Sequence, residues 1–511
     1  MPPRRELALL GVIVAAYLAL FGRALGYGYV WDDVQEIQRA PLFDGSLRDA
    51  LTATQADRID PFLTHQPGVQ LAYDSYRPLL MATFWAEVRL FGHQPRPMHA
   101  TNVALGALAI VIAYALTRRW LGSLALIPVA IFALHPLQTE CIAYISGRGD
   151  LLAGLFAMVA ALAALRGWGV VACGAFALSL LSKEACIALP LAVAALLVTR
   201  GELRARRWIP LAMLGVAVGY VVIRAAVIGT TSSLALGGAV VRLPGIALHY
   251  AALALLPFDL STEQPYPESF TAIGWIAVVL GVLGLAWWTR RRGLPTAPAL
   301  AGLAWLAVLL APTAIVIHTT RIASDRYAYV PLLGLAIALT DGAARLVRAK
   351  PGLRWPVAIA VALWGLMLVA VAWHQVTVWQ DDETLDTNAV AMAPDATAAY
   401  YRLGNVEAQA GRWDDAIGHF GRAVELDPHA FHALDNLGVA LLRTRRYVEA
   451  EEVLVRAVRE SPPAVYRASF NLGVARLALG KRAAGCADLQ RALAINPTYQ
   501  LAIDADRTSC H

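Results

Sequence analysis

Long apolar blocks, separated by short polar segments rich in arginine, fill the first three quarters of this chain. Several blocks approach or reach the ~20 residues that a helix needs to cross a bilayer, so the pattern predicts an all-α polytopic bundle with about 11 transmembrane helices. The expected spans are 6–26, 98–117, 121–135, 151–165, 170–182, 186–199, 209–228, 270–289, 296–317, 328–343 and 355–376. The apolar stretch 244–257 does not fit this count, and we expect it to form a re-entrant or interfacial helix.

The distribution of arginine predicts the orientation of the bundle. The first apolar block follows Arg4 and Arg5 and lacks a small-residue cleavage site, which indicates an uncleaved first helix with a cytoplasmic N-terminus. Basic clusters then fall on the cytoplasmic side, as the positive-inside rule requires. These clusters are Arg118/Arg119, Arg166, Arg204/Arg206/Arg207, Arg290/Arg291/Arg292 and Arg345/Arg348/Lys350. An odd number of crossings places the C-terminus outside.

Composition and charge support a membrane protein and argue against a nucleic-acid-binding one. Hydrophobic residues make up 58% of the chain, charged residues only 16%, and the mean hydropathy is +0.54, whereas a soluble protein carries about 25% charged residues. The net charge of +6 is uneven, because the residues from Asp381 onward contain 14 basic and 18 acidic side chains. The excess of positive charge therefore lies at the ends of membrane helices, and no basic stripe interleaved with aromatic residues is present.

The C-terminal third has a different pattern, with repeats of period 34, the period of tetratricopeptide (TPR) repeats. Pro394, Pro428, Pro462 and Pro497 mark successive repeat ends. We therefore expect a membrane domain over 1–378 and a TPR solenoid over 379–511, built from a leading half-repeat, three repeats and a cap helix. TPR arrays commonly bind peptides or proteins in their concave groove.

Polar residues collect on one side of the predicted bundle. The segments concerned are 27–97, 135–150, 182–185, 261–269 and 318–329, and all of them face outward in the predicted topology. Ionisable residues at membrane depth are costly to bury, so such a one-sided cluster indicates a functional site. The alternative for any single residue is an ordinary position in a loop at a helix end.

Five motifs rich in polar residues occur along the chain, and a junction to the repeats follows them. The motifs are YVWDDVQEI (29–37), YRPLLMATFWAEVRLFG (76–92), HPLQTECIAYISGRGDLLAGLF (135–156), LLSKEACIALPL (180–191) and SDRYAYVPLLG (324–334). Together they resemble the transmembrane and TPR-containing (TMTC) protein O-mannosyltransferases and their bacterial relatives, which are glycosyltransferases of the GT-C class. The resemblance implies transfer of a mannose-like sugar from a polyprenyl-phosphate donor to a serine or threonine hydroxyl of a protein. It places the chain in a membrane, the bacterial inner membrane for a bacterial relative, with an extracytoplasmic TPR domain that binds the acceptor or another partner.

The resemblance also assigns the catalytic base. In the GT-C class an acidic residue of the first outer loop takes the proton of the acceptor hydroxyl, which places that role on Asp32 or Asp33. We prefer Asp32. The structural alternative is that one of the two aspartates caps the helix that follows, since aspartate is a common N-cap residue.

Three cations are candidates for a clamp on the donor phosphate: Arg148, Lys183 and Arg326. A guanidinium grips phosphate through two parallel hydrogen bonds, and a lysine contributes a point charge. Asp150 and Glu184 accompany these cations and are expected to orient them. The alternative for each cation is an extended side chain that reaches the lipid headgroups.

Other polar residues of the motifs are candidates for supporting roles. His135 and Glu140 are candidates for supporting the site, although a histidine before proline at a helix end is more often a satisfied structural residue. Tyr76 and Arg77 are candidates to line the path of the acceptor. The sequence contains no CxxC, HExxH or glycine-rich phosphate loop, so we expect no cofactor besides a lipid-linked sugar donor, and leave open whether a divalent metal takes part.

Two other functions remain possible from the sequence. A non-catalytic membrane scaffold would recruit partners through the TPR repeats, but it gives no reason for charged residues to share one face. A transporter of lipid-linked sugar would carry charged residues near mid-membrane in repeated halves, which the sequence does not show.

Cys486 and Cys510 are the only cysteines of the predicted external domain. That compartment permits oxidation in the proposed topology, so we expect a disulfide between the third repeat and the cap helix.

Overall fold

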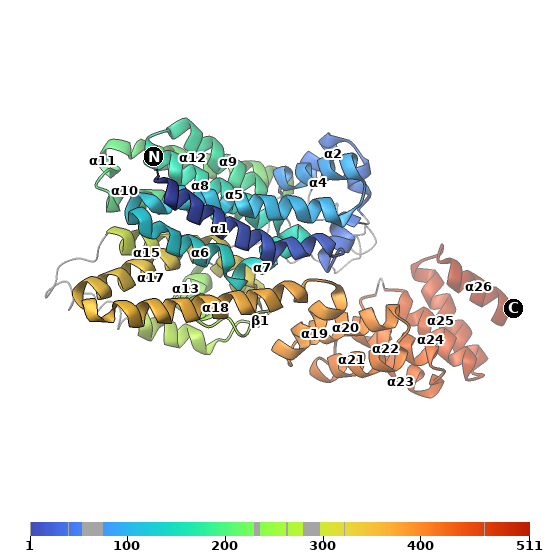
Figure 1. The fold of residues 1–511 in the computed structure, drawn as a ribbon. Helices are drawn as coiled ribbons and strands as arrows, with labels where there is room; N and C mark the ends of the chain where they lie inside the picture. The colour runs from blue at the N-terminus through green and yellow to red at the C-terminus, as the bar shows by residue number, and fades with distance from the viewer. Residues whose placement is uncertain are drawn as a thin grey trace. The chain divides into compact units, whose positions relative to one another are not determined.

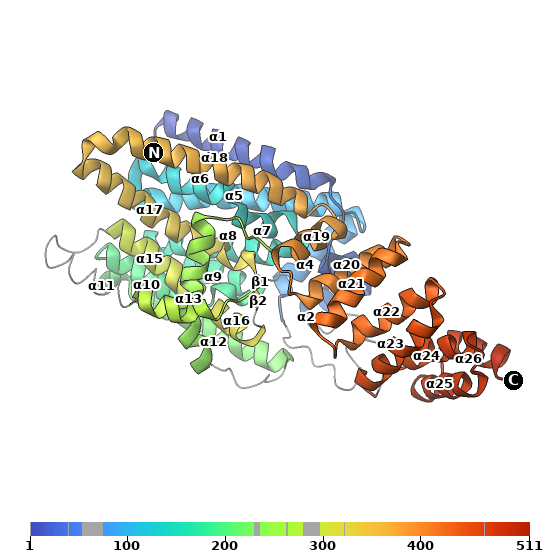
Figure 2. The same cartoon turned by 90° about the horizontal axis from the view of Figure 1, so that it is seen from below.

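The structure is a computed structural model. It describes residues 2–38, 40–53, 75–228, 236–261, 264–278, 297–320, 322–463 and 465–511. The chain forms two compact units, a membrane unit that ends at Asp381 and a repeat unit over Asp382–His511. Both are helical (Figures 1 and 2), which confirms the predicted fold class. Within the described ranges, the only strands are β1 (Gln264–Pro265) and β2 (Ile322–Ala323), which pair antiparallel.

The helices of the membrane unit are α1 (Arg4–Phe21), α2 (Leu47–Thr52), α4 (Pro78–Phe91), α5 (Pro95–Leu121), α6 (Leu126–Leu134), α7 (Thr139–Ala143), α8 (Arg148–Arg166), α9 (Gly169–Ser182), α10 (Leu189–Thr199), α11 (Leu203–Arg206), α12 (Trp208–Ile228), α13 (Leu236–Leu255), α15 (Ala297–Leu310), α16 (Thr313–Thr320), α17 (Tyr329–Ala349) and α18 (Arg354–Val378). In the part of the chain that the structure describes, seven helical stretches are long and apolar enough to cross a membrane. They are Arg4–Gly26, Pro95–Leu134, Ile145–Arg166, Trp208–Ile228, Gly238–Leu255, Asp325–Ala349 and Pro351–Val378. Shorter apolar helices cover Gly169–Ser182, Glu184–Thr199, Ser269–Val278 and Ala297–Leu310.

The observed helices differ from the predicted spans in two places, and a third span lies partly outside the described residues. The spans expected at 98–117 and 121–135 fall in one stretch, in which a 3-10 turn at Gly122–Ala125 joins α5 to α6. The segment expected to be re-entrant, 244–257, lies mostly in α13, one of the seven candidate spans. The span expected at 270–289 and the arginines at 290–292 extend beyond the described residues.

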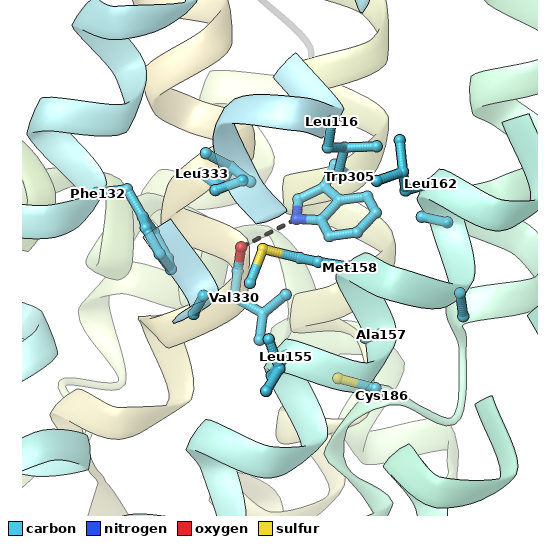
Figure 3. Close-up of a cluster of buried hydrophobic side chains, with 14 of the residues drawn as sticks. Leu116, Phe132, Leu155, Ala157, Met158, Leu162, Cys186, Trp305, Val330 and Leu333 are labelled. Carbon is cyan, nitrogen blue, oxygen red and sulfur yellow. Dashed lines mark hydrogen bonds between the residues drawn. The ribbon is translucent and has the colours of Figure 1, made fainter. Parts of the chain in front are cut away.

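Helix α8 lies at the centre of the membrane unit, and most of its residues are buried. Alanine, glycine and leucine occur on every side of it, a pattern typical of a helix that is surrounded by other helices. Figure 3 shows Met158 of this helix packed among side chains of neighbouring helices, where Trp305 donates a 2.9 Å hydrogen bond from Nε1 to the carbonyl of Val330. The same packing brings the N-terminal end of α8 close to other polar helix ends.

Two glycines allow α15 and α17 to approach each other closely. A Cβ atom added to Gly302 would lie 2.4 Å from the carbonyl oxygen of Gly334, and one added to Gly334 would lie 2.4 Å from that of Gly302. Small residues at a helix crossing are the usual means of tight packing in membranes, where van der Waals contact replaces the hydrophobic effect. This contact fixes the position of α17, whose N-terminal end contributes to the site described below.

Arginines of two of the predicted cytoplasmic clusters lie at the end of α8 that is opposite to its polar motif. Arg119 donates to the carbonyl of Leu165 at 3.1 Å, and Arg206 donates to the same carbonyl at 2.5 Å. Leu165 lies at the C-terminal end of the 19-residue α8, whereas the motif residues of that helix lie at its start. At 1.5 Å per residue the two ends are about 28 Å apart, which is close to the thickness of a bilayer core.

The repeat unit consists of three helix pairs with one helix before and one after them. Its helices are α19 (Asp382–Met392), α20 (Thr397–Gln409), α21 (Trp413–Leu426), α22 (Phe431–Arg443), α23 (Tyr447–Glu460), α24 (Arg467–Ala478), α25 (Arg482–Ile495) and α26 (Gln500–Ser509). A glycine at the same position of each repeat lets the two helices of a pair touch. A Cβ added to Gly404 would lie 2.7 Å from Phe420, and one added to Gly438 would lie 2.4 Å from Leu454.

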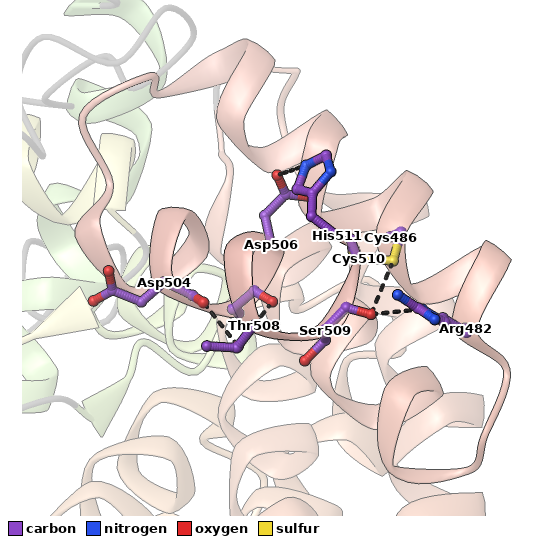
Figure 4. Close-up of a disulfide and its surroundings, with 9 residues drawn as sticks. Arg482, Cys486, Asp504, Asp506, Thr508, Ser509, Cys510 and His511 are labelled. Atoms are coloured by element: carbon purple, nitrogen blue, oxygen red, sulfur yellow. Dashed lines mark hydrogen bonds and ion pairs between the residues drawn. A yellow bond between two sulfur atoms is a disulfide. The ribbon is translucent and has the colours of Figure 1, made fainter.

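A disulfide between Cys486 and Cys510 ties α26 to α25, with the Cα atoms 5.7 Å apart. Figure 4 shows its surroundings, where Arg482 donates a 2.7 Å hydrogen bond from Nε to the carbonyl of Ser509. The disulfide and this hydrogen bond together hold α26 against α25.

We expect the unreduced, denatured protein to expose three thiols to alkylation, those of Cys141, Cys173 and Cys186, and five after reduction. We also expect Cys510→Ser to destabilise the terminal repeat by roughly 3 kcal/mol, because the open chain gains conformational entropy when unfolded. Mass spectrometry of alkylated peptides measures the first result, and proteolysis of α26 the second. Five reactive thiols without reduction would exclude the disulfide.

Candidate active site

A cavity of about 280 Å³ lies at the polar end of the membrane unit. It is lined by residues from the ends of several helices: Asp32, Glu36, Arg77, Leu80, Phe84, Tyr144, Ser146, Asp150, Lys183, Glu184, Ala185, Pro312, Thr313, Val316, Arg326 and Tyr327. Four of the five predicted polar segments contribute to this lining. The fifth, 261–269, contributes none of its described residues, although β1 within it pairs with β2 just before Arg326.

Asp32 is an exposed residue of the cavity wall. The residue before it, Trp31, has a φ of 55°, in the left-handed region that side-chain-bearing residues rarely adopt. Tyr144 donates a hydrogen bond from its hydroxyl to Asp32 at 3.3 Å. A strained backbone next to an acidic residue in a cavity is typical of functional sites, where the surrounding packing holds the strain.

Aromatic rings provide that packing. The Trp31 ring lies 5.6 Å from the ring of Tyr144, which in turn stacks on Trp379 at 5.1 Å. The guanidinium of Arg326 lies 5.7 Å from the centroid of the Trp31 ring, within the range of a cation–π interaction. The aromatic residues therefore connect the segment that carries Asp32 to the segment that carries Arg326.

Asp33, the other candidate base, is fully buried and does not line the cavity. It accepts hydrogen bonds from the backbone N–H and the hydroxyl of Ser146, at 2.8 and 2.6 Å, and from the N–H of Ile145 at 3.3 Å. Burial raises the pKa of Asp33 to about 8, against the lowering effect of these donors. The sequence left open that one aspartate caps the helix after it; the hydrogen bonds of Asp33 go instead to the turn that leads into α8.

Arg326 is held in the cavity wall by Glu140. Its Nη1 lies 2.9 Å from Glu140 Oε1, its backbone N–H donates to Oε2 at 2.8 Å, and Ser324 donates its hydroxyl to Oε1 at 2.7 Å. The Nε–H of Arg326 is buried and has no acceptor among the described residues. An unsatisfied buried donor costs about 1–3 kcal/mol, so a ligand oxygen at this position would be favoured.

Two further ion pairs line the cavity. Lys183 Nζ lies 2.6 Å from Asp150, and Arg77 pairs with Glu184 at 3.2 Å. The structure therefore brings Asp32, Lys183 and Arg326 to one cavity as predicted, together with the carboxylates that were expected to orient the cations. Arg77, predicted to lie on the path of the acceptor, belongs to the same lining.

Arg148, predicted to bind the donor phosphate with Lys183 and Arg326, is not part of the cavity lining. Its side chain is fully buried, pairs with Glu87 at 2.7 Å, and donates to Asn102 Oδ1 at 2.8 Å and to the carbonyl of Met98 at 2.9 Å. The guanidinium lies 4.5 Å from the Phe84 ring centroid. These partners connect α4, α5 and α8, so Arg148 fixes the scaffold behind the site.

His135 and Tyr76 also lie outside the cavity lining. The His135 ring bonds to the carbonyl of Ala254 at 2.8 Å and accepts from the N–H of Leu137 at 3.1 Å, and burial lowers its pKa to about 4. It is thus a neutral, satisfied residue at a helix end. Tyr76 contributes its carbonyl, which accepts a 3.3 Å hydrogen bond from Tyr220.

Sequence reasoning missed several residues of the site: Trp31, Glu36, Tyr144, Tyr327 and Trp379. All except Trp379 lie in the motifs quoted above, and Trp379 lies in the junction to the repeats. Their position in these motifs, next to the residues that were predicted, could have indicated that they belong to the site. In the described part of the chain, no group of three or more His, Cys, Asp or Glu side chains is placed to hold a metal ion.

Fold and site together define a polytopic helical membrane protein with a charged cavity at one end and a separate TPR unit. The family model of the tetratricopeptide repeat matches residues 384–431, 401–465 and 436–499. Human protein O-mannosyl-transferase TMTC3 is 24% identical over 509 residues, covering 87% of this chain and 54% of that protein. Human TMTC1 is 30% identical and Drosophila melanogaster Tmtc1 32% identical, each over 29% of this chain and 17% of its own length.

Homologues of this chain are therefore named protein O-mannosyl-transferases, among them human TMTC1 and TMTC3. The aligned region spans about half of the length of human TMTC3 and less of the other relatives.

We expect Arg148→Ala to destabilise the membrane unit by about 3–5 kcal/mol, because Glu87 would remain as an unpaired buried charge. The double variant Arg148→Met/Glu87→Gln should recover much of this loss, and Arg204→Ala, at an exposed arginine, should cause none. Thermal unfolding in detergent measures the effect. Normal stability of Arg148→Ala combined with weak donor binding would restore Arg148 to the phosphate site.

We expect the stability of the membrane unit to fall as the pH rises from about 4 towards the pKa of Asp33 near 8. The folded protein holds a proton on this carboxyl that the unfolded chain has already released, so the stabilisation is complete at low pH and is lost as the pH passes the folded pKa. Asp33→Asn, which keeps an acceptor for Ser146, should flatten this dependence in thermal unfolding series. An unchanged slope in Asp33→Asn would show that another group titrates.

Proposed function

We propose that this protein is an inverting GT-C glycosyltransferase that moves a mannose-like sugar from a polyprenyl-phosphate donor to a serine or threonine hydroxyl of a protein. The observation that carries the proposal is the presence of one exposed carboxylate, Asp32, and two cations, Lys183 and Arg326, in a single cavity at a membrane-helix end. The names of the homologues support O-mannosylation as the reaction.

Asp32 serves as the general base. As the acceptor oxygen forms its bond to the anomeric carbon, the hydroxyl proton passes to the Asp32 carboxylate, and the bond from the anomeric carbon to the phosphate oxygen breaks. The bonding electrons leave with the lipid phosphate. A positioned base of this kind accelerates a reaction by about 10²–10⁴-fold. The hydrogen bond from Tyr144 orients the carboxylate.

Arg326 and Lys183 stabilise the departing phosphate, whose charge grows in the transition state. The free Nε–H of Arg326 offers a donor that no described residue satisfies. Glu140 and Asp150 hold the two cations in place without supplying a ligand to the donor. Each cation is already paired with a carboxylate before the lipid-linked sugar binds. The ion pairs therefore position N–H groups that can donate hydrogen bonds to a phosphate oxygen.

The cavity faces the extracytoplasmic side in this proposal, and Arg119 and Arg206, at the other end of α8, face the cytoplasm. A lipid-linked donor fits that side, because nucleotide sugars are cytoplasmic. The TPR unit binds the acceptor protein or a partner in its groove. The membrane is the bacterial inner membrane if the chain is a bacterial relative.

We expect Asp32→Asn to lower mannosyl transfer by at least about 100-fold, with Asp32→Glu retaining part of the activity. Asp33→Asn, the adjacent control, should keep most of the activity, because Asp33 holds a turn and does not line the cavity. Transfer is measured with a polyprenyl-phosphate mannose donor and by mass spectrometry of the acceptor protein.

The opposite pattern, an inactive Asp33→Asn that folds normally and an active Asp32→Asn, would move the base to Asp33. Full activity in both variants would remove the catalytic proposal. If no glycan depends on the protein while its TPR partners still bind, the protein is a membrane scaffold.

A further inference from the structure

A second cavity, larger than the first, lies far from the charged site. It has a volume of about 640 Å³ and is walled by α6, α17 and α18, which lie side by side in both views of the fold (Figures 1 and 2). The wall consists almost wholly of aliphatic side chains, with Trp364 towards one end and Arg348 and Arg354 at the other. Its volume is within the ~300–1,000 Å³ range typical of ligand sites.

The two arginines flank the turn between α17 and α18. Helix α17 ends at Ala349, a 3-10 turn covers Pro351–Leu353, and α18 begins at Arg354. Helix α17 has 21 residues and starts beside Tyr327 of the charged cavity, so the turn is about 30 Å from that cavity. The arginine end of the second cavity therefore lies on the opposite face of the membrane.

The charge at this turn is strongly positive. Residues 341–354 contain Arg345, Arg348, Lys350 and Arg354 but only one carboxylate, Asp341. Asp341 pairs with Arg345 at 3.2 Å and lies 4.0 Å from Arg348. The Arg348 side chain is 63% exposed, and the Arg354 guanidinium lies 5.6 Å from the Trp355 ring centroid. One carboxylate cannot balance four basic side chains, so the mouth of the apolar groove keeps a net positive charge.

We propose that this groove binds one anionic phospholipid of the adjoining leaflet, with an acyl chain between α17 and α18 and the phosphate on Arg348 and Arg354. The apolar wall matches the chain, and the cations match the headgroup. Basic pockets between membrane helices are known to select anionic headgroups in this way. The first-turn N–H groups of α18, which begins at Arg354, add a favourable dipole for the phosphate. The lipid fills the space that the two consecutive helices leave between them.

The test uses the full-length protein in detergent with a phosphatidylglycerol that carries a photoreactive group on an acyl chain. Cross-linked peptides should map to α6, α17 and α18. Unlabelled phosphatidylglycerol should compete, whereas phosphatidylcholine and inorganic phosphate should not. Arg348→Ala/Arg354→Ala should lower labelling of the groove by about 30-fold, the order expected when two basic residues lose contact with an anionic lipid.

Arg204→Ala/Arg207→Ala provides the matched control, because it removes two exposed arginines from another turn and should leave labelling of the groove unchanged. Equal competition by phosphatidylcholine would show that the groove takes any acyl chain, and competition by inorganic phosphate would show a site for free anions. Either result overturns the proposal, as does unchanged labelling in the Arg348/Arg354 variant. The competition with unmodified protein decides the question even if that variant does not fold.

Discussion

Ionised side chains that are buried in a protein need partners, and the pairing of four cations organises the polar end of this protein. Arg326 pairs with Glu140, Lys183 with Asp150, Arg77 with Glu184 and Arg148 with Glu87, at distances of 2.6–3.2 Å. The partners come from different segments of the chain, up to 186 residues apart. Removing one partner of a buried pair leaves an uncompensated charge at a cost of about 3–5 kcal/mol. The pairs therefore hold the loops in a single arrangement.

The pairs divide into two groups with different consequences. The Arg148–Glu87 pair is sealed in the protein and joins three helices. The other cations line the cavity, where a donor hydrogen on Arg326 remains without a partner among the described residues. The adjacent aspartates divide in the same way, since Asp33 is buried in hydrogen bonds to the start of α8 while Asp32 is exposed to the cavity. One short motif thus supplies both a structural anchor and a candidate base.

The sequence predicted the helical fold class, the repeats and most charged residues of the cavity, because each depends on a local pattern. Apolar blocks, a period of 34 residues and polar helix ends are visible without knowledge of contacts. Burial cannot be predicted in this way, because Arg148 and Lys183 are both basic residues of polar motifs. Only the contacts of Arg148 with Phe84, Asn102 and Glu87 show that its side chain points away from the cavity. Trp379 could not be assigned either, because its stacking on Tyr144 joins segments that are distant in sequence. The α5–α6 turn and the extent of α13 also depend on tertiary packing.

The central claim is that the charged cavity binds the phosphate of a lipid-linked sugar beside Asp32. Cryo-electron microscopy of the full-length protein in lipid nanodiscs with a non-transferable polyprenyl-phosphate sugar tests it most directly. The account predicts phosphate density in contact with Arg326 and Lys183, with the anomeric carbon on the side of Asp32. A phosphate bound elsewhere, or an empty cavity at saturating ligand, would contradict it.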